Sequence, residues 1–491
     1  MLIGAQRTAR LASPSSNKLR RPNIFHLLPH RSDMSSISKK RANDTGRGEV
    51  SPPPSKRAAK QISTTTKQAV SNFFQPASQK VAKAEKLSWR TVDSSLIIGK
   101  YIASEAGTGE TSETPTKRKI AIFDFDSTLI STASKLKFAK DANDWCWWHG
   151  TVPSKLKTLH DDGYTIVIIS NQNGISLRPP KNAPKIVKND RFSQFKQKAG
   201  AVFNALNLPI SLYAATERDK FRKPSTGIWD EFLRDHNLTK DDIDWEKSIF
   251  VGDAGGRPAG TFNGKVVKAD FSCSDRNFAA NIGMRFETPE EYFLGEASRE
   301  FVRTIEPTSF VDGSDEAAVI SIQFQPSASK EIILFVGFPG AGKSTFFRKY
   351  LQPSGYERVN QDLLKSREKC FKVAGESLLS GKSVAIDSTN PDRDGRKAWI
   401  ALGVKHGVPI RCAHFTASKD LARHNDSVRA LSGLSELNPE ARAILPGLAF
   451  NSFASRYQEP KLGEGFSEII QISFAFDGTP EERAVWSKYW Y

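Results

Sequence analysis

One short stretch of the 491-residue chain has the residue types and spacing needed to surround a phosphate. Gly337-Phe-Pro-Gly-Ala-Gly-Lys-Ser344 follows an apolar run at 331–336 and precedes residues that are typical of a helix start. Its glycines let successive backbone N–H groups turn around an anion, and the new helix adds its positive end. Lys343 is expected to reach the β- and γ-phosphates, while Ser344 holds Mg²⁺. We therefore predict an ATP or GTP site and disfavour an ordinary glycine-rich turn.

A second group of reactive side chains lies upstream, where apolar runs end in polar residues. Asp124 and Asp126 end one such run and are separated by a single residue. Three later signals, in order along the chain, contain Ser170, Lys223 and Asp253. Open α/β sheets build their sites at the carboxyl ends of strands. This ordered set resembles the haloacid-dehalogenase superfamily of phosphatases, whose first motif is D-x-D-x-T, with Ser127 standing where glycine is usual.

The resemblance implies a role for four of these residues in phosphate hydrolysis. Asp124 is expected to attack phosphorus and form an aspartyl-phosphate. Asp126 is expected to protonate the leaving alcohol and then to activate water. Ser170 and Lys223 are expected to neutralise the equatorial phosphate oxygens as charge shifts. These four are the predicted catalytic residues of the phosphatase.

A metal ion is implied at the same place. Asp253, Asp124 and the backbone carbonyl of Asp126 would coordinate Mg²⁺, a hard ion that prefers oxygen ligands. A further acid beyond Asp253 stays open, with Asp270 and Asp275 as the alternatives. The predicted metal ligands are therefore Asp124, Asp126 and Asp253 here, and Ser344 at the nucleotide.

Downstream of the phosphate-binding stretch, two acids follow short apolar strands. Asp362 is a predicted general base for an attacking hydroxyl, with a helix N-cap as the alternative. Asp387 ends the second strand, where an acid is expected near the nucleotide. Arg423 and Arg429 lie on a polar helical segment and would form a lid whose arginines stabilise transferring phosphate; the alternative is a solvated charged face. His424, between them, is interpreted as structural or exposed.

The elements that must position these residues alternate between strands and helices. Runs such as 165–169 and 248–251 are continuously apolar, which indicates parallel sheets covered on both faces. Order is predicted to begin near residues 88–89, with a strand at 94–98. We predict an α/β protein, with a haloacid-dehalogenase-like Rossmannoid phosphatase domain followed by a P-loop kinase domain. The predicted parts are a disordered basic tail at 1–86, the phosphatase at 87–295, a connector at 296–329 and the kinase at 330–491.

Composition limits the class of protein. Through Arg90 the chain has 18 Lys or Arg and 4 Asp or Glu, a net +14, which leaves only +3 of the total +17 for the remaining 401 residues. The folded domains are thus nearly neutral. The four cysteines form no C-x-x-C pair, which indicates a reduced, intracellular protein without a structural zinc site. No apolar run approaches the roughly 18 residues of a membrane span, so we predict no membrane partner.

The basic tail carries patterns typical of targeting. Its first 32 residues contain no acid and resemble a mitochondrial presequence, with a solvated basic tail as the alternative. Met34 is an alternative start that would remove this segment. Basic clusters at 39–41 and 56–60 bracket a proline-rich spacer and resemble a two-part nuclear import signal. We predict a nuclear protein, with the mitochondrion as an additional location.

An aromatic pair in the same tail suggests a partner. Val70 precedes Phe73 and Phe74 in an otherwise polar segment, which resembles the box that docks on the replication sliding clamp. Lys67 stands where that box prefers glutamine. Exposed adjacent phenylalanines indicate an interaction site, and we predict sliding-clamp binding through these three residues.

The combination of both halves resembles the polynucleotide kinase 3′-phosphatase family of DNA end-processing enzymes. Its matching motifs are 123–129, 221–224, 251–258, 270–276, 288–292, 337–345, 359–362, 386–392 and 423–425. The resemblance implies removal of 3′-phosphates from DNA ends and phosphorylation of 5′-hydroxyl ends, with ATP and Mg²⁺ as cofactors. Gln361 replaces the arginine that usually precedes the general base. The predicted ATP-binding residues are Gly337, Gly340, Gly342, Lys343, Ser344 and Thr345, and the predicted kinase catalytic residues are Asp362 and Arg423.

Two other functions stay open at this stage. A metabolic bifunctional kinase/phosphatase acting on a small molecule is compatible with the near-neutral charge of residues 91–491. A non-catalytic DNA-end-binding adaptor is disfavoured, because every expected catalytic position is filled. We expect the protein to be a monomer.

Overall fold

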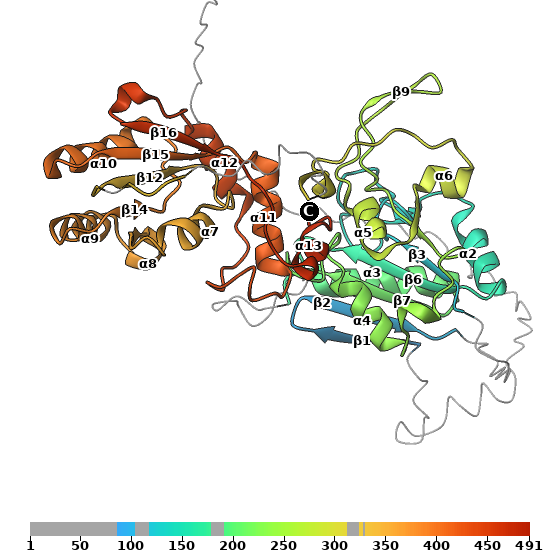
Figure 1. The fold of residues 1–491 in the computed structure, drawn as a ribbon. Coiled ribbons are helices and arrows are strands. Elements are labelled where there is room, and N and C mark those ends of the chain that lie inside the picture. The colour runs from blue at the N-terminus through green and yellow to red at the C-terminus, as the bar shows by residue number, and fades with distance from the viewer. Residues whose placement is uncertain (1–85, 104–116, 178–190, 312–323, 328) are drawn as a thin grey trace, which may run out of the picture. The chain divides into compact units, whose positions relative to one another are not determined.

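The structure is a computed structural model that describes residues 86–103, 117–177, 191–311, 324–327 and 329–491 (Figure 1). The predictions made for the basic tail, including Val70, Phe73 and Phe74, lie outside these residues. The described residues form two α/β units, each built on one large sheet.

The first unit is a seven-stranded sheet whose central strands are parallel. Its strand order is β1-β2-β7-β6-β3-β8-β11, and only the β1–β2 and β2–β7 pairs are antiparallel. The strands are β1 (Leu87–Val92), β2 (Leu96–Tyr101), β3 (Ile120–Phe123), β6 (Thr165–Asn171), β7 (Ile210–Ala215), β8 (Ile249–Val251) and β11 (Arg285–Glu287). The strand predicted at 94–98 begins two residues later, because Ser94 has a positive φ of 53° in the turn after β1.

Alternation along the strands explains why helices cover both faces of this sheet. In β3, Ala121 and Phe123 face one apolar core, and Ile120 and Ile122 face the other. The first core packs against α2 (Val152–Asp161), α3 (Arg191–Leu206) and α6 (Pro289–Leu294), and the second packs against α4 (Gly227–Asp235) and α5 (Ser274–Ile282). Continuously apolar strands are required by this double burial.

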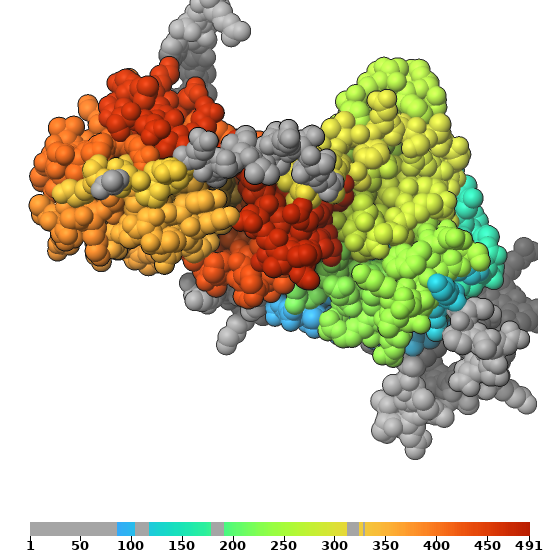
Figure 2. Space-filling view, viewed as in Figure 1, coloured from blue at the N-terminus to red at the C-terminus, as the bar shows by residue number. Residues whose placement is uncertain are grey.

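Two short hairpins extend from the first unit. One pairs β4 (Ile130–Ser131) with β5 (Cys146–Trp147), and the other pairs β9 (Gly260–Phe262) with β10 (Lys265–Val267). The second hairpin is solvent-exposed, as its yellow-green atoms at the surface in Figure 2 show. It lies in the chain between the loop that follows β8 and the start of α5.

The second unit is a five-stranded sheet in which every pairing is parallel. Its order is β13-β14-β12-β15-β16. The strands are β12 (Ile332–Val336), β13 (Glu357–Val359), β14 (Val384–Ile386), β15 (Ile410–Phe415) and β16 (Glu468–Ile472). The helices are α7 (Lys343–Phe346), which continues as a π-helical turn at Phe347–Leu351, α8 (Gln361–Leu364), α9 (Arg367–Leu379), α10 (Arg393–His406), α11 (Lys419–Leu431), α12 (Gly447–Arg456) and α13 (Pro480–Trp486).

Helices again cover both faces. Ile333 and Phe335 of β12 pack in one core with residues of α7, α11 and α13, whereas Ile332, Leu334 and Val336 pack in the other with α9 and α10. The predicted fold class is confirmed. The domain limits 87–295, 296–329 and 330–491 remain a proposal. Among the described residues, no helix is both long and apolar enough to cross a membrane.

Candidate active sites

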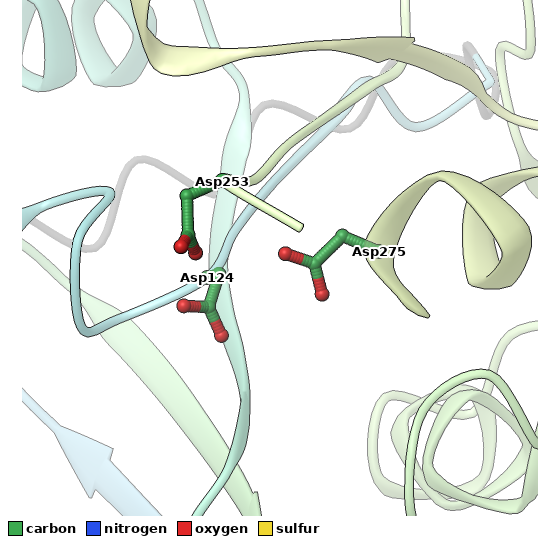
Figure 3. Close-up of side chains that lie close together, drawn as sticks. All are labelled: Asp124, Asp253 and Asp275. Carbon is green, nitrogen blue, oxygen red and sulfur yellow. The ribbon is translucent and has the colours of Figure 1, made fainter. Parts of the chain in front are cut away.

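Three buried or half-buried carboxylates converge at the carboxyl edge of the first sheet (Figure 3). Asp124 follows β3, Asp253 follows β8, and Asp275 lies in the first turn of α5. β3 and β8 are parallel neighbours with Phe123 opposite Val251, so both strands deliver their following acid to the same place. One oxygen from each of the three carboxylates lies within 4.8 Å of the others.

The structure selects between the two acids that the sequence left open. Asp275 belongs to the carboxylate cluster, whereas Asp270 is bound elsewhere. Both oxygens of Asp270 accept hydrogen bonds from Arg257 Nε, at 3.1 and 2.9 Å. Gly252 makes the approach of Asp275 possible, because a Cβ at that position would lie 2.5 Å from the Asp275 carboxylate.

A buried lysine balances part of this negative charge. Lys223 Nζ lies 2.7 Å from Asp124 Oδ1 and 2.8 Å from Asp275 Oδ1, and it also donates to the Ile169 carbonyl at 2.7 Å. Burial works against the charged form, but the two carboxylates raise the pKa of Lys223 above its ordinary value. The lysine therefore stays charged beside Asp124.

One lysine does not neutralise three acids. Burial, with repulsion from Asp275, raises the pKa of Asp124 to about 7 despite the opposing charge of Lys223. Burial and the charges of Asp124 and Asp275 raise the pKa of Asp253 to about 8. Oxygen donors that repel one another in this way fit a hard divalent cation, which would favour their ionised forms.

Asp126 points to a different set of partners. Its Oδ1 lies 2.8 Å from Lys198 Nζ, and its Oδ2 accepts a hydrogen bond from Gln172 Nε2 at 2.7 Å. The same Gln172 nitrogen donates to Ser170 Oγ at 2.9 Å. The predicted acid, Asp126, and the predicted phosphate ligand, Ser170, are thus connected through one amide. Ser127 has φ 63°, the left-handed conformation for which glycine is preferred.

Lys198 is a site residue that sequence reasoning missed. It lies on α3 and is the second lysine within hydrogen-bond distance of an acid of the D-x-D motif. Nothing in the sequence around it distinguishes it from other lysines of an amphipathic helix. Its contact depends on α3 packing against the sheet through Phe195 and Val202.

The second unit carries a pocket of about 1540 Å³ at the carboxyl ends of its strands. Five of the six predicted nucleotide-binding residues, Gly340 to Thr345, line it. Gly340 has φ 83°, and a Cβ there would lie 2.2 Å from the Ala422 carbonyl oxygen of α11. The remaining one, Gly337, accepts a hydrogen bond from Lys343 Nζ at 3.0 Å. Burial lowers the pKa of Lys343 to about 8, although Asp387 opposes this effect.

Ser344 and Asp387 are brought together as a metal-holding pair requires. Ser344 Oγ donates to Asp387 Oδ2 at 2.8 Å, and Asp387 follows β14. The same carboxylate oxygen accepts from Arg358 Nε at 2.9 Å and from Arg358 Nη2 at 2.6 Å. Hydroxyl and carboxylate oxygens suit a divalent cation that accompanies a nucleotide.

Asp362 lines the pocket and is not the cap of its helix. The N-cap of α8 is Asn360, whose side chain accepts from the backbone N–H groups of Asp362 and Leu363 at 2.9 and 3.3 Å. The side chain of Asp362 is 78% exposed, and its Oδ2 lies 3.9 Å from Arg442 Nη1. The N-cap alternative is therefore wrong, and the carboxylate is available to a substrate.

The arginines of α11 differ from each other in position. Arg429 lines the pocket and pairs with Asp426, whereas the Arg423 guanidinium lies 4.3 Å from the centre of the Tyr491 ring and is not a lining residue. His424 is fully buried, its Nε2 lies 2.9 Å from the Trp486 carbonyl oxygen, and burial lowers its pKa to about 4. A structural role for His424 agrees with the sequence prediction.

Polynucleotide phosphatases and kinases are among the known proteins that this chain is similar to. A family model described as Polynucleotide kinase 3 phosphatase matches residues 119–293, and one described as an AAA domain matches residues 332–460. The bifunctional polynucleotide phosphatase/kinase of Schizosaccharomyces pombe is 41% identical over 410 residues, which are 83% of this chain and 88% of that protein. Two polynucleotide 3'-phosphatases match smaller shares of this chain. The Saccharomyces cerevisiae protein is 28% identical over 35% of the chain and 86% of its own length, and the Arabidopsis thaliana protein is 35% identical over 36% of the chain and 24% of its own length.

Proposed function

This chain belongs to the bifunctional polynucleotide phosphatase/kinase family, and from that premise we propose that it heals DNA ends in strand-break repair. Its first unit would remove 3′-phosphates, and its second would phosphorylate 5′-hydroxyls with ATP. The observation that supports the proposal is the presence of two groups of residues in one chain, the Asp124–Asp253–Asp275 cluster with Lys223 and the Lys343–Ser344–Asp387 pocket with Asp362.

In the phosphatase, Asp124 would attack the phosphorus of a 3′-phosphate while Lys223 neutralises charge on the phosphate. The bond between phosphorus and the 3′-oxygen breaks, and Asp126 gives its proton to that oxygen. Asp126 then takes a proton from water, whose oxygen attacks the aspartyl-phosphate and releases inorganic phosphate. A divalent cation held by the three acids would offset the charge that phosphate brings to them.

In the kinase, Asp362 would take the proton of the 5′-hydroxyl, whose oxygen attacks the γ-phosphorus. The bond to the β-phosphate oxygen breaks, and ADP leaves. Lys343 would exchange its contacts with the Gly337 and Phe338 carbonyls for the β- and γ-phosphates. Arg429 lines the same pocket and would stabilise the transferring group, whereas Arg423 would need to move to contribute directly.

The kinase and phosphatase domains imply the use of a nucleotide and a divalent metal, and the acidic cluster could hold such an ion. We propose that these are ATP and Mg²⁺. Oxygen ligands alone do not separate Mg²⁺ from Mn²⁺, so activity with each ion and a chelator is the direct measurement. Isothermal titration calorimetry with ATP and, separately, with GTP would measure the affinity of the protein for each nucleotide independently of turnover.

We propose that the basic tail determines the location of the protein in the cell and one of its partners. Its basic clusters support nuclear import, its acid-free start supports an additional mitochondrial form, and Val70, Phe73 and Phe74 support docking on a sliding clamp. A peptide spanning residues 60–80 would bind the clamp at sub-millimolar concentration, and its Phe73→Ala, Phe74→Ala form would not. We also propose that the protein is monomeric, which light scattering would test.

One substrate tests both activities together. A nicked duplex with a 3′-phosphate and a 5′-hydroxyl at the nick, incubated with ATP and Mg²⁺, is expected to acquire a 3′-hydroxyl and a 5′-phosphate. Sugar phosphates and small alcohols serve as the competing substrates, because a small-molecule kinase/phosphatase is the less well supported alternative. A preference for the small molecules, or unchanged DNA ends, would refute the proposed function.

A further inference from the structure

The kinase pocket contains a cluster of charged side chains whose roles are not explained by the mechanism above. Glu440, in the loop between α11 and α12, contacts three arginines through its two carboxylate oxygens. Its Oε1 accepts from Arg348 Nη1 and from Arg358 Nη1, both at 2.8 Å. Its Oε2 accepts from Arg442 Nε at 2.8 Å and lies 2.6 Å from Arg442 Nη2. One carboxylate therefore fixes three long side chains.

Two of these arginines connect Glu440 to the reacting groups. Arg358 also binds Asp387, through the carboxylate oxygen that accepts the hydroxyl of the nucleotide-binding serine. Arg442 extends in the other direction, with Nη1 3.9 Å from Asp362 Oδ2. Glu440 thus lies between the nucleotide side of the pocket and the side where an acceptor hydroxyl must be deprotonated.

We propose that Glu440 is a positioning residue of the kinase, which is held by Arg348 and Arg358 and which in turn holds the Arg442 guanidinium beside Asp362. In this position Arg442 faces the place where the 5′-oxygen, the γ-phosphate and the general base meet, so it is a catalytic residue that the sequence did not indicate. The inference rests on the proposed function, since it concerns the transfer step of that reaction.

The physical reason lies in the freedom of the arginine side chain. Arg442 is in a loop without regular secondary structure, so neither a helix nor a strand fixes its direction. An unheld arginine would sample many rotamers, and ordering it during the reaction would cost free energy. The contact of two Arg442 nitrogens, Nε and Nη2, with Glu440 Oε2 orders the side chain beforehand, which is the condition for effective electrostatic stabilisation of a transition state.

The state of Glu440 agrees with this role. Burial would favour its neutral form, but the hydrogen bond and charge of Arg358, with the charge of Arg442, hold the pKa of Glu440 below its ordinary value. It is therefore ionised at neutral pH. Its side chain is 23% exposed, so the pairs are partly shielded from water and salt.

The main test replaces Glu440 by glutamine, which keeps the shape and removes the charge. In Glu440→Gln, kcat for 5′-phosphorylation is expected to fall roughly ten- to hundredfold, because a misplaced group costs about that much. The KM for ATP should change less than kcat, since no described contact joins Glu440 directly to Lys343 or Ser344, and 3′-phosphatase activity should be unchanged. Glu436→Gln is the matched control, because Glu436 lies in the same loop, hydrogen-bonds only to Ser435 among the contacts described and should leave kcat unaltered.

A double-mutant cycle separates positioning from a general effect on the loop. If Glu440 acts through Arg442, the combination of Glu440→Gln with Arg442→Ala should be no slower than Arg442→Ala alone. Losses that multiply would overturn the inference, and so would a wild-type kcat for Glu440→Gln. If Glu440→Gln cannot be purified, Arg442→Lys is measured in its place, since lysine keeps the charge and loses the Nε contact with Glu440. Full kinase activity of Arg442→Lys would overturn the inference.

Different results would refute the proposed function and the role of Glu440. Unmodified protein that does not phosphorylate 5′-hydroxyl oligonucleotides would refute the proposed function. Unmodified protein that does so, with Glu440→Gln equally active, would refute only the assignment of Glu440. Binding of ATP measured in the same preparations reports that the kinase unit of each variant is folded, and phosphatase activity reports the same for the first unit.

Discussion

The two proposed active sites hold their proposed reacting carboxylates, Asp124 and Asp362, in opposite surroundings. The Asp124 side chain is 10% exposed and bonded to Lys223 at 2.7 Å, whereas the Asp362 side chain is 78% exposed, with Arg442 at 3.9 Å. A nucleophile must be held in line with phosphorus, while a general base needs only to reach a hydroxyl. The phosphatase carboxylates are thus held together before substrate binds, whereas Asp362 remains free to approach the substrate hydroxyl.

The two sites also differ in their net charge. The phosphatase gathers three acids around one lysine, which leaves negative charge for a metal ion to offset. The residues that line the kinase pocket include six Lys or Arg and four Asp or Glu, which leaves an excess of positive charge for a triphosphate. Each site is thus complementary to the species that it must still acquire.

The largest expected effect comes from the preassembled site. Asp124→Asn should lower 3′-phosphatase activity by at least about 10⁴-fold, because an amide does not form the acyl-phosphate and is a poorer metal ligand. Kinase activity should persist, which a 5′-hydroxyl oligonucleotide assay with labelled ATP would measure. Loss of both activities in a protein that melts normally would mean that the two sites are not independent.

Replacing the exposed Asp362 should reduce kinase activity by less than replacing the buried Asp124 reduces phosphatase activity. Asp362→Asn is expected to reduce 5′-phosphorylation by roughly 10²–10⁴-fold, the usual contribution of a general base. Binding of ATP should be retained, because Lys343 and the glycine loop are untouched, and the phosphatase should be unaffected. A variant with full kinase activity would contradict the assignment of Asp362 and move the search to another acceptor of the proton.

A single methyl group tests whether the carboxylate cluster is preassembled. In Gly252→Ala the new Cβ would meet the Asp275 carboxylate at 2.5 Å, so Asp275 must move. We expect phosphatase activity to fall by about 10²-fold with the kinase unchanged. Gly260→Ala is the matched control, because a Cβ there has no atom within 4 Å. Equal activity of the two variants would indicate that the cluster tolerates displacement.

The smallest effect concerns stability as a function of pH. The pKa of Asp124 is raised to about 7 and that of Asp253 to about 8. The folded protein without metal therefore keeps protons that the unfolded chain releases near pH 4. Its stability should fall as pH rises through that window, by up to about 1.4 kcal/mol per pH unit for each proton.

Calorimetry in chelator and in Mg²⁺ would measure this dependence. We expect Tm in chelator to decline from about pH 5 to about pH 8, and Mg²⁺ or Asp253→Asn to flatten the decline. A Tm that rises over this range in chelator would show that the carboxylates are already stabilised in their ionised forms.

Features that depend on residues close together along the chain could be predicted from the sequence. The D-x-D motif, the glycine loop and the continuously apolar strands are local patterns, and they were sufficient to predict the confirmed α/β class and the family. Backbone geometry explains this, since parallel strands bring the residues that follow them to one edge whatever the details of packing. Asp124 and Asp253 are adjacent for that reason.

Tertiary structure decided the contacts between distant segments. It placed Asp275 and not Asp270 in the cluster, brought Lys198 to Asp126, and directed Arg423 away from the pocket. It also assembled the Glu440 network from loop residues that carry no motif, with Arg358 and Arg442 on either side. The direction of a side chain on a helix, and the partner of an acid in a loop, depend on how whole elements pack, and local sequence spacing does not encode that packing.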